Sequence, residues 1–415
     1  MLRKLKLYNL LYFIPMPVFF TATGIYRGSA LNDDTFALPI SIIVFFAVFF
    51  CSTKYIGVLL GRRTILLLIF LLYSILIFVL KIIFCGSDLN PNLLLVSTMP
   101  LLVSFCFGYK LKPYLIRGNL IKIVNKVVFV FSLFCMAHLL SSFVSLGVVG
   151  TFVNRGEDSV FGFFSVYQKL VYYPTMVSCF FILSLFTTLK YKYIYSTMLL
   201  LVILMTGARE ALLISIFGII SSSLLSKKVK SVNNILKYFL LFFVICVLII
   251  YFIDPIKEIY ESAPLITKLK NLSESSDITA GRTGAIHTVF GNSAADFNLL
   301  IGTGYSMNLG DFRSPHNQYA EILLRSGTIG LSLFFVFIIG ILRNMLINIK
   351  QYRYTIIRYV IYSFVVVYLC LLFISFNVNV PVRAPYTAIL FGFLSGFFYN
   401  IEIPKLYSSN FGEGK

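Results

Sequence analysis

Long apolar runs separated by short polar loops dominate this chain. Most runs hold about 17–25 residues with few charges, which is the length an α-helix needs to cross the hydrocarbon core of a bilayer. The pattern predicts an all-α integral membrane protein, with about twelve transmembrane helices in one polytopic domain over residues 1–415. The expected spans are roughly 8–25, 37–53, 64–84, 93–109, 122–149, 167–188, 192–206, 209–225, 234–253, 327–345, 357–376 and 384–400.

One segment between spans is too long to be a simple connector. It covers about residues 254–326, before the tenth span, and its apolar patches repeat with helical spacing. We therefore expect a large loop that contains short amphipathic helices on or near the membrane surface.

The basic residues predict the orientation. If the N-terminus is cytoplasmic, the inner loops hold about twice as many Lys and Arg residues as the outer loops, as the positive-inside rule requires. Both termini are then cytoplasmic and the 254–326 loop lies outside. This topology also explains most of the net charge of +19, so nucleic-acid binding is not expected.

Composition excludes an ordinary soluble protein, because 59% of residues are hydrophobic and only 12% are charged. The seven cysteines show no metal-site or disulfide spacing, so we expect small buried side chains. The sequence has no Walker A, His-Glu-x-x-His or Asp-x-Asp motif. Neither a metal nor a cofactor is expected. The basic, then apolar N-terminus is interpreted as the first span rather than a cleaved signal.

Several arginines fall on the predicted outer side, where the topology rule disfavours them. The guanidinium group matches phosphate geometry, so arginines beside a membrane indicate a lipid-linked phosphate or diphosphate. Arg209 is expected at a helix N-terminus, where backbone N–H groups also attract anions. A snorkelling pair of Arg209 with Glu210 is the alternative.

Three histidines are present, and His316 is the one placed for chemistry. It follows a proline at the end of the outer loop and can accept a proton from a hydroxyl. Asn317 could orient a sugar. Glu321 could face the same site, or pair with Arg325 one helical turn later. His138 falls inside a span and is expected to be packed or hydrogen-bonded there, and Lys81 is the other ionisable residue expected inside a span.

Three short motifs occur in order along this architecture. His316-Asn317 is followed by nine residues, then Gly327, two residues and Gly330. Arg209 and Leu213 form Arg-x-x-x-Leu, and Gly302 and Gly304 form a Gly-x-Gly stretch. In this combination the chain resembles the O-antigen polymerase and O-antigen ligase superfamily of integral-membrane glycosyltransferases.

The resemblance implies a helical fold similar to the C-type glycosyltransferases, in the bacterial inner membrane with a periplasmic active site. The donor would be an undecaprenyl-diphosphate-linked oligosaccharide, used without a metal. Membrane lipid and a chain-length regulator protein would be further partners. The catalytic residues would be His316, Arg209 and Arg282, with substrate-binding neighbours Arg313, Asn317, Tyr319, Arg155 and Arg325.

Three functions stay open. The Thr206–Glu210 stretch and the spacing from Gly302 to His316 look more like the polymerases, which join repeat units, than the ligases, which transfer glycan to lipid A-core. A transporter or flippase of the same lipid-linked unit is the third. It should show charges near the bilayer midplane and related halves, and the sequence shows neither clearly.

Overall fold

The computed structural model describes the parts of the chain that carry most of the predicted spans. The described residues are 65–85, 101–102, 104–106, 108–109, 112–113, 115–116, 120–153, 173–186, 192–206, 208–225, 299–304, 317–353, 357–374 and 385–400. They form α-helices and the turns beside them, and this part of the chain contains no strand. The helices are α4 (Ile65–Cys85), α6 (Leu120–Val153), α7 (Tyr173–Phe186), α8 (Lys192–Thr206), α9 (Arg209–Leu225), α14 (Gln318–Gln351), α15 (Arg358–Ile374) and α16 (Pro385–Tyr399).

These helices match the predicted spans closely. Only α14 differs clearly, because it begins at Gln318 and not near residue 327. The end of the predicted outer loop is therefore already helical, and its helix is packed into the protein. The predicted spans 8–25, 37–53 and 234–253 lie outside the described residues, as does most of the predicted 254–326 loop.

The described helices are apolar both inside and outside. On α4, Leu72, Leu76 and Ile83 are exposed, whereas Phe70 and Ile77 are buried. A helix that is hydrophobic all round needs an apolar solvent or a large core. Two described helices, Leu120–Val144 within α6 and Gln318–Gln351, are long and apolar enough to cross a membrane, and the others are shorter apolar helices.

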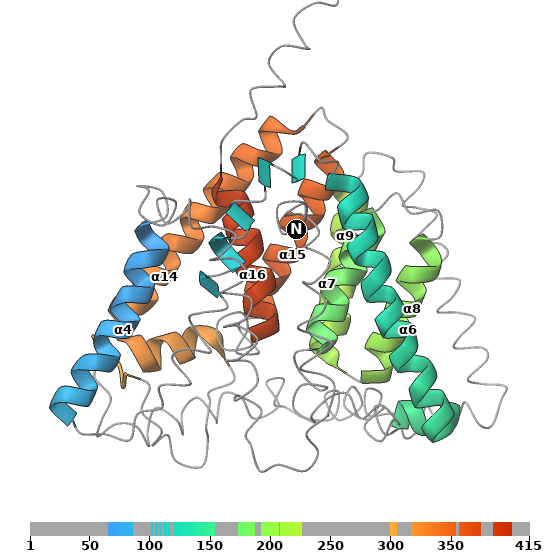
Figure 1. Ribbon diagram of the computed structural model, residues 1–415, viewed down its shortest axis with the longest axis horizontal. Coiled ribbons are helices and arrows are strands. Elements are labelled where there is room, and N and C mark those ends of the chain that lie inside the picture. The colour runs from blue at the N-terminus through green and yellow to red at the C-terminus, as the bar shows by residue number, and fades with distance from the viewer. Residues whose placement is uncertain are drawn as a thin grey trace, which may run out of the picture.

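The helices form two groups joined by α15 (Figure 1). In one group α7 packs against α8 and α9, and α6 covers α8. In the other group α14 packs against α4 and α16. Because α15 contacts α7, α9 and α14, it connects the two halves of the bundle.

A pair of glycines brings α16 very close to the helical turns at residues 101–109. Gly392 and Gly396 are four residues apart, the small-residue spacing that lets two membrane helices approach. A Cβ atom on Gly396 would lie 1.9 Å from the Phe105 carbonyl oxygen, and one on Gly108 would lie 1.9 Å from the Phe393 oxygen. Both backbones are therefore in direct contact.

Lys112 joins the ends of two helices at the side of the bundle that the predicted topology places in the cytoplasm. Its side chain is buried, and the ammonium group donates to the Asn348 side chain and the Asn400 carbonyl. The Asn348 amide in turn donates to the Phe398 carbonyl. These bonds satisfy carbonyls at the end of α16, which would otherwise lack partners.

Replacing Gly396 with Ala should destabilise the protein, because the added methyl group has no space beside Phe105. We expect a loss of about 1–3 kcal/mol, as for other overpacked sites. Thermal unfolding of the purified protein in detergent measures it. Gly340→Ala is the matched control, since a Cβ there meets nothing within 4 Å, and it should be neutral or stabilising. Equal midpoints for the two variants would contradict the close contact.

Candidate active site at the break in α14

Helix α14 is broken at Gly327. This residue has φ 64° and ψ −170°, a conformation that side-chain-bearing residues rarely adopt. The break separates a short first segment, 318–326, from the long remainder of the helix, and Figure 1 shows the first segment turned away from the direction of the rest.

The loop 299–304 fills the break with its own backbone. In a continuous helix the carbonyls of Leu324 and Arg325 would accept from the amides four residues later. Here Thr303 N donates to Leu324 O (2.7 Å) and Gly304 N to Arg325 O (2.9 Å). The displaced amides are satisfied as well, because Thr328 N donates to Leu299 O (2.9 Å) and Ile329 N to Leu300 O (3.3 Å). Two helical hydrogen bonds are thus replaced by four bonds to the loop.

The glycines of the sequence motifs permit this contact. A Cβ atom on Gly327 would lie 2.1 Å from the Leu300 oxygen, and one on Gly302 would lie 2.5 Å from the Arg325 carbonyl carbon. Gly302 and Gly304 also have positive φ angles of 76° and 68°. The Gly-x-Gly stretch and the glycine that follows His316-Asn317 are therefore two sides of one backbone junction.

The first segment of α14 is held by contacts of four side chains. Asn317 is its N-cap, and the Asn317 Oδ1 atom accepts from the backbone N–H groups of Tyr319 and Ala320 at 3.0 Å each. The Tyr319 hydroxyl donates to the Leu372 carbonyl of α15 (3.0 Å). Glu321 and Arg325 form a buried ion pair, as the alternative interpretation of these residues predicted. All three predicted site residues in this segment thus have structural contacts, and their roles toward substrate stay predictions.

Helix α4 runs antiparallel to α14 and extends past the break. The Phe70 ring contacts Phe334 with centroids 5.6 Å apart, and Tyr73 lies beside Gly330. Further along α4, Ile77 and Lys81 lie against Gly304. The predicted topology requires these two helices to be antiparallel, and they are.

Lys81 is the candidate site residue that sequence reasoning missed. The sequence predicts it only as an ionisable residue inside a span, and it does lie in α4. The structure adds that it packs against the loop that fills the break, since a Cβ atom on Gly304 would lie 2.6 Å from Lys81 Cγ. Helical spacing from Phe70, Ser74 and Ile77 puts Lys81 on the inward stripe of α4, which was the available signal.

A chain of contacts connects this junction to the start of α9. Leu372, the partner of Tyr319, lies close to Cys370 on α15, and Cys370 lies near Cys179 of α7. The neighbouring Ser178 hydroxyl donates to the Ala211 carbonyl of α9 (2.9 Å).

Arg209 is the first residue of α9, as predicted, two positions before Ala211. The start of α9 and the start of α14 therefore lie at the same end of the bundle. His316 directly precedes the cap residue Asn317 in the chain. Arg155, Arg282, Arg313 and His316 itself lie outside the described residues.

His138 is packed and hydrogen-bonded, as predicted. It is buried in α6, and its Nδ1 atom lies 3.1 Å from the Tyr173 hydroxyl, which itself lies 3.6 Å from Cys135 Sγ. Cys135, Cys179 and Cys370 are buried free thiols, again as predicted. Within the described ranges, no group of three or more His, Cys, Asp or Glu side chains could hold a metal ion.

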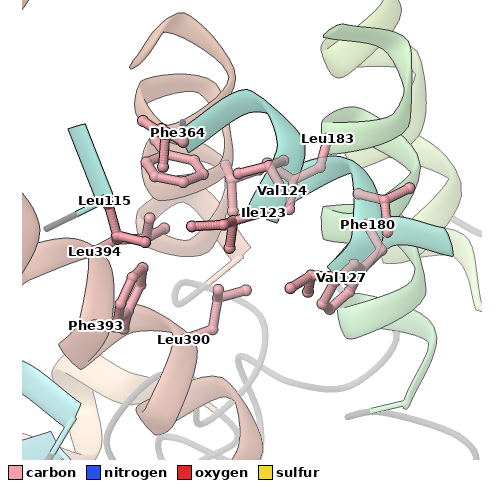
Figure 2. A pocket seen from close by; sticks show the side chains of 13 residues that line it. Leu115, Ile123, Val124, Val127, Phe180, Leu183, Phe364, Leu390, Phe393 and Leu394 are labelled. Atoms are coloured by element: carbon pink, nitrogen blue, oxygen red, sulfur yellow. The ribbon is translucent and has the colours of Figure 1, made fainter. Parts of the chain in front are cut away.

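A separate cavity lies between α6, α7, α15 and α16 (Figure 2). All its lining side chains are hydrocarbon or aromatic, among them Leu115, Ile123, Phe180 and Phe364. It lies toward the start of α6, near the Lys112 end of the bundle and away from the junction. Because it offers no polar group, it cannot hold a diphosphate.

Replacing Gly327 with Ala should loosen the junction, since the new methyl group meets the Leu300 oxygen. The strained backbone adds about 1–3 kcal/mol. Hydrogen exchange followed by mass spectrometry should show faster exchange over 299–304 and 324–329. Ile329→Ala is the control, because its side chain is 42% exposed and its backbone N–H is kept. Exchange as slow in Gly327→Ala as in the control would argue against a backbone junction.

Comparison with known proteins supports the resemblance seen in the motifs. Residues 194–335, about a third of the chain, match the family model described as O-antigen ligase. This region begins in α8, contains Arg209, His316 and the whole junction, and ends in α14. No curated protein matches the chain. The apolar helices and the ordered motifs around the junction agree with this similarity to the O-antigen ligase family.

Proposed function

We propose that the protein is an O-antigen polymerase that joins undecaprenyl-diphosphate-linked oligosaccharide repeats at the periplasmic face of the inner membrane. The observation that carries the proposal is the junction between loop 299–304 and the break in α14. It fixes the first segment of α14, whose cap Asn317 is bonded directly to His316. The cap residue that follows His316 in the chain is thus itself held by packing, and catalytic residues need such support from their surroundings.

The reaction follows from the residue chemistry. The acceptor sugar hydroxyl attacks the anomeric carbon of the donor, and the bond from that carbon to the diphosphate oxygen breaks. His316 takes the hydroxyl proton as general base or holds the hydroxyl in position. Arg209 and Arg282 stabilise the negative charge that builds on the departing lipid diphosphate.

Arg209 suits this role by its position. It is the first residue of α9, where unsatisfied backbone N–H groups and the helix dipole add to its own charge. Arg155, Arg313 and Arg325 are proposed as further substrate contacts, with Asn317 and Tyr319. Because Arg325 is buried against Glu321, we expect it to act mainly by holding the segment in place.

The second candidate is an O-antigen ligase, which would transfer the finished glycan to lipid A-core. The description of the matching family model favours this function. Donor chemistry and site residues would be the same, and only the acceptor would differ. Transport is less well supported, because the predicted site residues that the structure describes gather toward one end of the bundle.

His316→Ala, Arg209→Ala and Arg282→Ala should each abolish or strongly reduce glycan extension. Loss of one donor to a developing charge typically reduces the rate about 100- to 1,000-fold. The measurement is glycan length made by purified protein from lipid-linked repeats, with folding checked by thermal unfolding. Arg343→Ala is the matched control, since Arg343 is an exposed arginine on the far part of α14. Full-length glycan from all three variants would exclude the proposed site.

Deletion of the gene separates polymerase from ligase. If the protein is a polymerase, cells without it should make lipopolysaccharide capped with a single repeat unit. If it is a ligase, the core should stay bare and glycan should accumulate on the lipid carrier. Gel analysis of lipopolysaccharide reads both outcomes, and bare core would overturn the polymerase assignment.

A further inference from the structure

We propose that Lys81 of α4 is a substrate-binding residue of this site, and that its ammonium group binds the lipid-linked diphosphate. The inference rests on the proposed function and extends it to a part of the chain outside the region 194–335 that matches the family model. The junction in α14 and the register of α4 against it carry the argument.

Lys81 lies on the inward face of α4. The inward stripe of this helix is apolar or weakly polar, with Phe70, Ser74 and Ile77 buried, and Lys81 continues it. A lysine between apolar turns and on the inner face of a membrane helix is costly, and such residues usually mark a substrate path or an ion pair.

Lys81 also contacts the loop 299–304. The stem of Lys81 packs on Gly304, where a Cβ atom would lie 2.6 Å from Cγ and 3.2 Å from Cβ of the lysine. Any side chain at residue 304 would therefore displace the lysine. Gly304 thus has two functions: its amide closes the break in α14, and its missing side chain makes room for the cation.

Gly304 connects Lys81 to the first segment of α14. Gly304 N bonds the Arg325 carbonyl, and eight residues of helix separate Arg325 from Asn317. At 1.5 Å per residue, the segment from Asn317 to Arg325 is about 12 Å long, which is comparable with the length of a diphosphate that carries a sugar. The neighbouring Thr303 hydroxyl is buried and has no hydrogen-bond partner in the described part of the chain, so the loop offers a second polar atom to a ligand.

An ammonium group fits a diphosphate as a flexible point charge with three donors.

Direct binding to the intact protein in detergent tests the inference, with farnesyl diphosphate as the probe and farnesol as the uncharged control. Lys81→Met should weaken farnesyl diphosphate binding about 10- to 100-fold, the usual effect of losing one charge-assisted hydrogen bond. Lys81→Arg should keep most of the affinity. Lys122→Met, which removes an exposed lysine at the other end of the bundle, should bind as the wild type does.

A second measurement uses the wild-type protein alone, so it holds even if Lys81→Met does not fold. Farnesyl diphosphate should protect Lys81, but not Lys122, from an amine-acylating reagent, as read by mass spectrometry, and farnesol should not. If the wild type binds the probe but Lys81 is not protected, the inference is overturned while the proposed function stands. If the wild type neither binds the probe nor extends glycan, both are overturned.

Discussion

The structure depends on one exchange of backbone hydrogen bonds. Gly327 breaks α14, and a broken helix within an apolar environment leaves amides and carbonyls that nothing else can satisfy. The loop 299–304 supplies the missing partners for Leu324, Arg325, Thr328 and Ile329. The bend in α14 is therefore a fixed feature, and it sets the position of the first helical segment, whose cap residue follows His316 in the sequence.

The sequence predicts the described helices and contains the motifs, but it does not show that loop 299–304 and the break in α14 lie together. Apolar runs predicted α4, α6 and α15 because their length and hydropathy are local properties. They could not predict that α14 begins at Gln318, since the capped first segment is polar enough to resemble loop. The sequence shows the motif glycines. Their role depends on the contact between two separate chain segments, which no local pattern predicts.

Lys81 and Glu321 differ in how well the sequence predicts their contacts. The spacing of Glu321 and Arg325 along one helix predicts their ion pair, so sequence reasoning could weigh it. The contact of Lys81 with Gly304 could not be predicted, because the two residues are more than two hundred positions apart in the sequence. The apolar cavity between α6 and α16 was likewise beyond prediction, because it is formed by residues from four helices. The cavity lies at the other end of the bundle from the junction.

Determining where a lipid-diphosphate-linked oligosaccharide binds is the most direct test of the account. The measurement is a structure of the full chain in a lipid nanodisc with that donor bound. The diphosphate should lie at the end of the bundle formed by the loop 299–304, the first residue of α9 and the start of α14. A diphosphate found at the opposite end, beside Lys112 and Asn400, would contradict it.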